Sequence, residues 1–266
     1  MTEQVSVLIP AYNGHDDLER TLRSLREDGP VAVLVVDDGS VPPIAPPQIA
    51  GLSVDVLRMP HNVGIERALR AGIEELARRG VRYAARIDTG DLALPGRLAK
   101  QRAYLDAHAQ VAAVGMWAQV VSRDGVPRFI LAPPAAPGDV RRLRFARSCF
   151  VHPAMMLRVD AVLQAGNYRA RYRAAEDLDL FLRIMESHEC ANLPEVGLLY
   201  ELNEGGISAT KRRTQILSTL RLQLAYFEPG NPYYWLGLAK NLLHFATPYK
   251  ALHLLKRALY RQRTTT

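Results

Sequence analysis

The sequence of 266 residues contains little cysteine and few aromatic residues, and it lacks any long apolar run. Two cysteines, Cys149 and Cys190, cannot build a disulfide framework, and they lack the paired spacing of a zinc site. No apolar run reaches the roughly 18 residues that a membrane-spanning helix needs, and residues 1–5 lack the positive charge of a signal peptide. We therefore expect a cytoplasmic protein with buried thiols.

Several motifs of known chemistry are also missing. There is no G-x-G-x-x-G turn after a strand, no G-x-x-x-x-G-K-[ST] loop and no H-E-x-x-H pair. A dinucleotide dehydrogenase, a nucleotide hydrolase of the P-loop type and a zinc protease of that motif are thereby disfavoured. No Ser or Cys nucleophile motif stands beside a plausible base either, so any chemistry must rest on carboxylates.

The charge is unevenly distributed along the chain. Residues 1–206 carry 24 Lys and Arg against 26 Asp and Glu, whereas residues 207–266 carry ten basic residues and one acid, Glu228. A basic tail on a near-neutral body suggests an anionic surface as partner, either nucleic acid or the inner leaflet of a membrane. We expect no nucleic-acid binding, because the aromatic residues are not interleaved with the basic ones as a stacking groove requires.

The tail has apolar residues at helical spacing over residues 214–227 and 233–260, with lysines and arginines among them. Helices of this kind lie in a membrane interface, where aromatic and basic residues are favoured. The alternative is that the same apolar faces pack on the body of the protein or on a second subunit of a homodimer. We favour contact with a membrane surface because the charge asymmetry needs a cause.

Ahead of the tail, short apolar runs alternate with amphipathic segments, which predicts βαβ units and a mostly parallel sheet. We expect four strands in the first part of the chain, at residues 5–9, 31–36, 54–58 and 83–87. We expect helices from Asp16 or Asp17 to about Gly29, and over residues 65–79, 98–108 and 177–187. Residues 111–121 predict a pair of strands, 127–137 a proline-rich loop, and Asp139 the cap of a short basic helix.

Polar residues follow three of the predicted strands, where ligands bind in open parallel sheets. They are Tyr12, Asn13, Asp37, Asp38, Asp88 and Asp91. For any single loop, turn formation explains such residues at least as well as ligand binding does. Acids after both the second and the fourth strand favour a ligand site for the set as a whole.

Six short motifs carry a family resemblance. They are I-P-A-Y-N at 9–13, V-D-D-G-S at 36–40, N-V-G at 62–64, I-D-T-G-D at 87–91, H-P at 152–153 and E-D-L-D-L at 176–180. Over about residues 4–205, their order and intervals resemble those of family 2 glycosyltransferases. The resemblance implies a GT-A fold, which is an α/β architecture with a Rossmann-like, mostly parallel sheet flanked by helices. It also implies a nucleoside-diphosphate-sugar donor and inversion at the anomeric carbon.

We accordingly divide the chain into a nucleotide-sugar-binding and catalytic domain, residues 1–205, and a basic amphipathic helical extension, residues 206–266. Position by position, the resemblance implies that the donor nucleotide contacts Pro10, Ala11, Tyr12, Asn13, Asp38, Asn62 and Asp88. Asp38 would accept the N–H of a pyrimidine ring, a charge-assisted bond. Asn62 would lie near the ribose or base, although a turn role before Gly64 explains it equally well.

The resemblance also implies roles on the acceptor side. Asp177 would be the general base that takes the proton of the acceptor hydroxyl, and Glu176 would orient the acceptor or the loop. The alternative is that both acids merely favour the start of a helix through its dipole. His152, before Pro153, would line the acceptor side, and a structural role is the alternative for it.

The sequence departs from the family pattern at Gly90, where the family usually has an acid that binds the metal ion. Asp88 and Asp91 are three residues apart in a turn and can converge on one Mg²⁺ or Mn²⁺, whose shell diphosphate and water would complete. The alternatives are a water-bridged ion, or no metal, with Arg86 or Arg97 neutralising the leaving group. We expect dependence on a divalent cation.

The hypothesis from sequence is an inverting glycosyltransferase of the hexosyltransferase type. It would move one sugar from a UDP- or dTDP-sugar to a saccharide or a polyprenyl-linked saccharide in surface polysaccharide synthesis, at the inner face of the cell membrane. The competing hypothesis is a catalytically idle nucleotide-sugar-binding or scaffold protein of the same fold, which the departure at Gly90 suggests.

Overall fold

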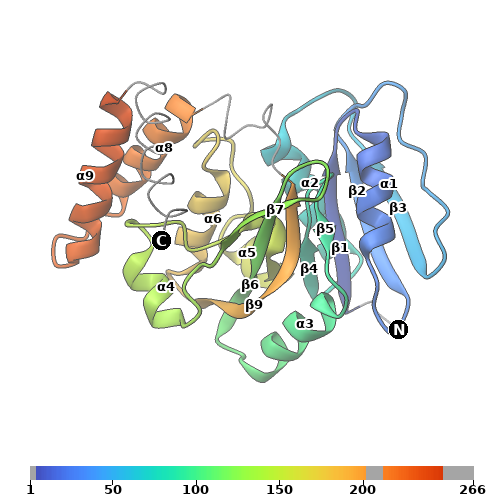
Figure 1. Cartoon of the computed structure of the whole chain (residues 1–266), viewed down its shortest axis with the longest axis horizontal. Coiled ribbons are helices and arrows are strands. Elements are labelled where there is room, and N and C mark those ends of the chain that lie inside the picture. The colour runs from blue at the N-terminus through green and yellow to red at the C-terminus, as the bar shows by residue number, and fades with distance from the viewer. Residues whose placement is uncertain (1–3, 202–211, 248–266) are drawn as a thin grey trace.

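The β-branched runs near the N-terminus form strands that are buried at the centre of the fold. β1 (Val5–Ala11), β2 (Val31–Asp37), β3 (Leu52–Arg58) and β4 (Tyr83–Arg86) pair in parallel in the order β3-β2-β1-β4. The crossover helices α1 (His15–Ser24) and α2 (Ile65–Arg78) belong to different core clusters and so cover opposite faces of the sheet. The computed structural model describes residues 4–201 and 212–247 (Figure 1).

The sheet continues beyond β4 with strands of mixed direction. β8 (Met156–Arg158) runs antiparallel to both β4 and β6 (Val111–Val121), so β6 has the direction of β4. β9 (Glu189–Glu201) pairs in parallel with β6 and antiparallel with β5 (Leu92–Ala93). β7 (Pro127–Leu131) pairs antiparallel with the second half of β6. The result is a mostly parallel α/β sheet, as the sequence predicted.

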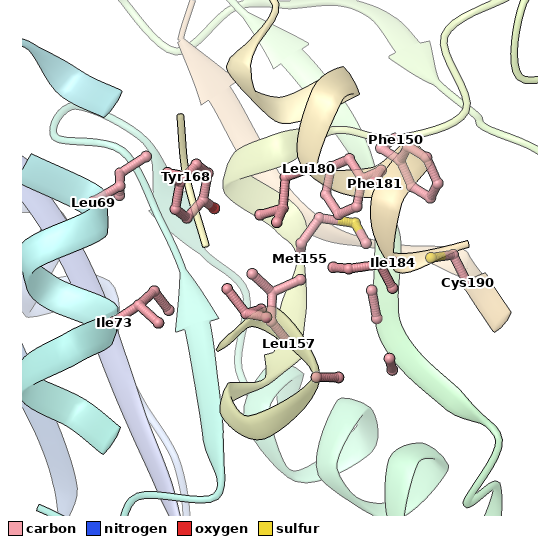
Figure 2. Close-up of a cluster of buried hydrophobic side chains, with 14 of the residues drawn as sticks. Leu69, Ile73, Phe150, Met155, Leu157, Tyr168, Leu180, Phe181, Ile184 and Cys190 are labelled. Carbon is pink, nitrogen blue, oxygen red and sulfur yellow. The ribbon is translucent and has the colours of Figure 1, made fainter. Parts of the chain in front are cut away.

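Two hydrophobic cores lie on the two faces of this sheet. Alternate residues of β2 enter different cores: Leu34 and Val36 join one, and Val33 and Val35 the other. The first core also includes side chains of α2, β8, α5 (Val159–Gln164) and α6 (Glu176–Ile184), several of which Figure 2 shows. The second core is completed by α1 and α3 (Arg97–Ala107). The remaining short helices are α4 (Pro137–Leu143) and the 3-10 turn η1 (His152–Ala154).

The two described helices of the C-terminal region pack on the body of the protein. α8 (Arg212–Ala225) and α9 (Pro232–Ala246) contribute Leu222 and Tyr234 to the first core. The Tyr234 ring meets Phe145 edge to face at 5.4 Å between centroids. Ser218 Oγ donates to the carbonyl of Arg173 at 2.9 Å. The helical extension is therefore docked through a small set of inward-facing residues. The proposed boundary between residues 205 and 206, and residues 248–260 of the second predicted helix, lie outside the described residues.

Several local predictions were wrong. Asp16, Asp17 and Asp139 do not cap their helices but lie in the first turn, after Gly14 and Ala136 at the N-cap positions. Their acidic groups still suit the positive end of the helix dipole.

Strand predictions also failed beyond residue 110. Residues 111–121 form one strand instead of two, and residues 127–131 form β7 where a loop was expected. β7 was not predicted because four of its five residues are exposed and only Leu131 packs against the second core, so the strand has no alternating apolar pattern. β9 was not predicted because Pro194 and Glu195 interrupt its apolar run, at the place where its register with β6 shifts.

The docking of α9 makes a prediction at Gly237. A Cβ added there would overlap the backbone carbonyl of Phe145 and come 3.0 Å from the Gln223 amide nitrogen. Gly237→Ala should therefore destabilise the packing of α9 by about 1–3 kcal/mol, the usual cost of overpacking. Urea unfolding together with amide hydrogen exchange along α9 measures the effect. Gly230→Ala is the matched control, because nothing lies within 4 Å of its added Cβ; equal stability of both variants would contradict the packing described.

Candidate active site

The topology brings the predicted site residues to one edge of the sheet. β1, β2 and β4 are parallel and end in Ala11, Asp37 and Arg86, so the loops that follow them share the carboxyl edge. β8 is antiparallel to β4, so η1, which contains His152 and precedes β8, also lies at this edge. The backbone N–H of Arg86 donates to the carbonyl of Met155 at 2.7 Å, which joins the two segments directly.

On the donor side, Asp38 holds the loop that contains Asn62. Its two carboxylate oxygens accept the N–H groups of Val63 at 2.7 Å and Gly64 at 3.0 Å, and its own N–H donates to Ala11 at 2.9 Å. Each carboxylate oxygen has a second acceptor position. Asp38 is therefore a buried support of the Asn62 loop, and each of its oxygens can still accept a further donor.

Two neighbouring polar residues, Asp37 and Asn13, stabilise the loops through hydrogen bonds. Asp37 is completely buried and accepts hydrogen bonds from Ser40, Ile44 and Arg58; burial alone would raise its pKa, but these bonds bring the pKa of Asp37 below its usual value. Asn13 joins the β1 and β2 loops, because its N–H donates to Ser40 Oγ at 3.0 Å and its Oδ1 accepts from Val41 at 2.8 Å.

The other predicted nucleotide contacts differ in accessibility. Pro10 and Ala11 belong to β1, and the carbonyl of Pro10 accepts from Thr89 Oγ1 at 3.0 Å. The side chain of Tyr12 is 54% exposed, and Asn62 is exposed as well. Tyr12, Asn13 and Asn62 are thus the accessible members of the predicted nucleotide set on these two loops.

A buried guanidinium lies beside Asp88. Arg86 is 1% exposed, and it donates to Asp88 Oδ1 at 2.6 Å and to the carbonyl of Ile87 at 2.7 Å. Asp88 itself has a side chain that is 37% exposed. One oxygen of Asp88 is therefore fixed by a cation while the residue stays open to a ligand.

Asp91 is enclosed behind Asp88. Its Oδ1 accepts the N–H of Glu201 at 3.0 Å, and its Oδ2 has no hydrogen-bond partner among the described residues. Burial, and next the charge of Asp88, raise the pKa of Asp91 to about 8. Between the two acids, Gly90 has φ of +103° and its N–H donates to Thr21 Oγ1 at 2.9 Å.

Arg97, the second cation considered from sequence, makes its hydrogen bonds to buried groups in the interior of the protein. Its guanidinium donates to the carbonyl of Arg86 at 2.6 Å and to Gln101 Oε1 at 3.0 Å. Burial lowers the pKa of Arg97 to about 10, and the residue is 2% exposed. Its hydrogen bonds hold β4 against α3, which leaves Arg86 as the buried cation that contacts a site carboxylate.

The residues predicted for the acceptor side lie at the start of α6. Glu176 and Asp177 are its first two residues, after Ala174 in a left-handed conformation with φ of +59°. Glu176 Oε2 is buried without a partner among the described residues, and burial, followed by the charge of Asp177, raises the pKa of Glu176 to about 8. Burial also raises the pKa of Asp177, although a hydrogen bond from Leu178 N–H and the charge of Arg86 oppose the rise.

The charges of Arg86 and Asp88 reach the acid pair at the start of α6. The charge of Asp88 acts on the pKa of Asp177, and the charge of Arg86 lowers the pKa of both Glu176 and Asp177. Arg86 contacts the acid that follows β4, and its charge also favours the ionised form of the acid pair that begins α6.

His152 is hydrogen-bonded to a residue of the first core. Its Nε2 and the Tyr168 hydroxyl are hydrogen-bonded at 2.8 Å. Burial and the charge of Arg86 hold the pKa of His152 well below 6.5, so the imidazole is neutral. Tyr168 is buried in the core cluster with Leu69 and Leu180 (Figure 2). This contact gives His152 a clear structural role.

Sequence reasoning missed some residues of the site. Tyr200 lies on β9, and burial and the charges of Asp91, Asp88 and Asp177 raise its pKa to about 12. Arg20 pairs with Glu201 at 2.5 Å and also donates to the carbonyl of Gly90 at 3.2 Å. Tyr200 and Glu201 end a strand that the apolar pattern did not reveal; a prediction of β9 would have placed them at the same edge.

The fit of a divalent cation depends on Asp88 and Asp91. The described residues contain no group of three His, Cys, Asp or Glu side chains placed to hold a metal ion. Two carboxylates are nevertheless present. Asp88 is partly exposed, and Asp91 has an oxygen without a hydrogen-bond partner among the described residues. The negative charge of Asp88 disfavours ionisation of Asp91. A cation would relieve that repulsion, and Mg²⁺ commonly uses one or two carboxylates besides phosphate and water. The residues therefore fit an ion held chiefly by Asp88.

The sequence model of the family described as glycosyl transferase family 2 matches residues 6–164. The chain belongs to this family. It is 32% identical to the amylovoran biosynthesis glycosyltransferase AmsE of Erwinia amylovora over 85% of this chain and 87% of that protein. It is 28% identical to the succinoglycan biosynthesis protein ExoO of Rhizobium meliloti over 90% of this chain and 72% of that protein.

Solved structures show the same fold for this family 2 glycosyltransferase. Residues 1–349 of TarS from S. aureus, in complex with UDP-GlcNAc, align with a TM-score of 0.65 at 18% identity, over 91% of this chain and 72% of that chain. The mannosyltransferase PcManGT from Pyrobaculum calidifontis, in complex with GDP-Man and Mn²⁺, aligns with a TM-score of 0.61 at 16% identity, over 98% and 80% of the two chains. The family, the GT-A fold and the enzyme class expected from sequence are confirmed.

The close approach of the β2 and Asn62 loops makes a prediction at Gly39. This glycine has φ of +80°, and an added Cβ would lie 2.5 Å from the His61 carbonyl carbon and 2.7 Å from the Asn62 nitrogen. Gly51 has φ of +81° with nothing within 4 Å. Gly51→Ala should lower the free energy of unfolding by about 1–2 kcal/mol, because alanine disfavours the left-handed conformation. Gly39→Ala should lower it by about 1–3 kcal/mol more, because its Cβ would also overlap the Asn62 loop. Urea unfolding compares them, and equal destabilisation would show that the loops do not meet as described.

Proposed function

We propose that this glycosyltransferase moves one sugar, with inversion, from a UDP- or dTDP-sugar to a hydroxyl of a saccharide or lipid-linked saccharide in surface polysaccharide synthesis. The observation that carries the proposal is the shared charge environment of Asp88 and Asp177 around the buried Arg86. It supports a donor diphosphate beside Asp88 and an acceptor hydroxyl beside Asp177. The polysaccharide-synthesis names of the relatives AmsE and ExoO support the class of product.

The donor nucleotide would bind across the loops after β1 and β2. The exposed ring of Tyr12 offers an apolar face for the base, and Asp38 retains acceptor capacity for a ring N–H. Asn62 would be available to the ribose or base, because the bonds that Val63 and Gly64 donate to Asp38 hold its loop beside these groups. Pro10, Ala11 and Asn13 would shape this pocket through their backbone.

The reaction would be a single displacement at the anomeric carbon. The acceptor oxygen forms a bond to that carbon while the bond to the donor phosphate oxygen breaks, and the hydroxyl proton passes to Asp177. Because Glu176 and Asp177 are neighbours in a buried position, they favour a state in which one proton is shared by the pair. Glu176, with its pKa near 8, would hold that proton and orient the acceptor, which leaves Asp177 as the base.

The leaving diphosphate needs positive charge nearby. A divalent cation held by Asp88, with Asp91 behind it, would offset the negative charge that develops on the leaving group. Arg86 keeps Asp88 oriented for this role through its bond to Oδ1. In the same proposal, residues 1–205 are the catalytic domain, and residues 206–266 are an extension that keeps the enzyme at the inner face of the cell membrane.

The competing function is a nucleotide-sugar-binding scaffold without turnover. The observation that favours it is Gly90. Nothing lies within 4 Å of a Cβ added at this position, so the site has room for an acidic side chain, but the glycine supplies no carboxylate to bind a metal ion. The two functions differ in turnover, whereas both include binding of the donor.

Asp177→Asn separates the two functions. If Asp177 is the base, the variant should lose about 10²–10⁴-fold in kcat and should still bind UDP, because the residue lies on the acceptor side. Thermal shift with UDP-, GDP-, dTDP- and CMP-sugars, with and without Mn²⁺, first selects the donor. Asp160→Asn, at an exposed position in the first turn of α5, is the control and should keep wild-type kcat. A kcat retained by Asp177→Asn would refute the assignment of the base, and donor binding without turnover by the wild type would favour the scaffold.

A further inference from the structure

The outward side of α9 carries an apolar stripe that the protein does not cover. Six residues at helical spacing form it: Trp235, Leu236, Ala239, Leu242, Leu243 and Ala246, all of them exposed. Residues at these intervals share one side of a helix, which a globular protein normally turns toward its core. α9 does the reverse, and Figure 1 shows the helix at the outer edge of the molecule.

The inward side of α9 uses different residues. Tyr234 and Gly237 are buried against Phe145, and Asn241 Nδ2 donates to Gln223 Oε1 at 2.8 Å. The orientation of the helix is therefore fixed by a close glycine contact, one aromatic ring and a polar bond. The apolar stripe is left outside by this packing.

Further exposed apolar side chains lie on α8 and in the turn between the two helices. We define the outer apolar face as the exposed side chains of Leu217, Leu224, Phe227, Trp235, Leu236, Leu242, Leu243 and Phe245. These are eight of the fourteen large apolar side chains that are exposed in the described part of the chain. The rings of Phe227 and Trp235 meet edge to face at 6.0 Å, which links the turn to α9. Such concentration marks an interaction surface.

The basic residues around this face favour an anionic binding partner. Within residues 212–247 the one acid, Glu228, is paired with Arg144. Arg213 and Arg221 are exposed and have no ion-pair partner among the described residues. A second copy of the chain would bring the same positive charges together, whereas an anionic bilayer attracts them and accepts the apolar side chains. No helix among the described residues is long and apolar enough to cross a bilayer, so the contact would be interfacial.

We propose that the outer apolar face docks α8 and α9 onto the surface of an anionic bilayer. The bond from Ser218 of α8 to the Arg173 carbonyl ties these helices to the loop that leads into Glu176. Given the proposed function, the acceptor saccharide is therefore one whose lipid anchor lies in the same bilayer. The docking itself does not depend on the proposed transfer reaction.

The test uses the full chain and the fluorescence of Trp235. Trp117→Phe makes Trp235 the single tryptophan, because the sequence has two. Vesicles of phosphatidylglycerol mixed with phosphatidylcholine should bind the protein, shift Trp235 emission to the blue and, when the tails are brominated, quench it. Vesicles of phosphatidylcholine alone should bind it at least about tenfold more weakly, since each basic residue near an anionic surface adds to binding.

Two triple variants locate the contact. Leu236→Gln, Leu242→Gln and Leu243→Gln together should lower the partition coefficient at least about tenfold, because they remove apolar area from the interface. Val126→Gln, Phe129→Gln and Ile130→Gln, which change three other exposed apolar residues in and next to β7, are the matched control and should bind like the wild type. Circular dichroism confirms that both variants fold.

Three outcomes would overturn the docking. They are equal binding to neutral and anionic vesicles, wild-type binding by the leucine variant, and self-association that the leucine variant abolishes without any vesicle binding. Donor binding, measured separately by thermal shift with UDP-sugars, keeps a failure of the docking distinct from a failure of the proposed function. Faster transfer to a lipid-linked than to a soluble acceptor, lost in the leucine variant, would support the placement of the acceptor; equal rates would refute it.

Discussion

The ion pair between Arg86 and Asp88 is the interaction on which the rest of the site depends. A buried guanidinium is costly unless carboxylates and hydrogen bonds compensate it. Arg86 meets this need through Asp88 and the carbonyl of Ile87, and its charge also acts on Glu176 and Asp177. The charge of Arg86 in turn favours the ionised form of Glu176 and Asp177, whereas burial alone would favour their neutral form. The groups that we assign to the donor and to the acceptor are thus coupled through the charge of Arg86.

The sheet topology makes this balance possible. The parallel direction of β1, β2 and β4 could be predicted from the sequence, because their apolar runs are continuous and stop at polar residues. That pattern also placed Asp38 and Asp88 at one edge. The arrival of His152 at the same edge depends on β8 running antiparallel, and its three residues carry no periodic signal. Tyr200 and Glu201 were missed for a similar reason, since Pro194 interrupts the strand that delivers them.

The C-terminal helices show a second limit of sequence patterns. The spacing of apolar residues in α9 correctly predicted a helix, but it could not tell which side the protein buries. Gly237 decides this in the structure, because only a residue without a side chain admits the backbone of Phe145. The apolar stripe is consequently exposed. Packing on the body explains one side of the helix, and contact with a membrane is our proposal for the other side.

The dependence of kcat on pH in Arg86 variants tests the central claim most directly. Asp177 must be ionised to act as base and burial raises its pKa, so kcat of the wild type should fall as pH drops through a value above the usual range for aspartate. Arg86→Gln removes the cation that favours ionised Asp177, so this acidic limb should move to higher pH, while Arg86→Lys should keep it closer to the wild-type position. An acidic limb at the wild-type pH in Arg86→Gln would contradict the account.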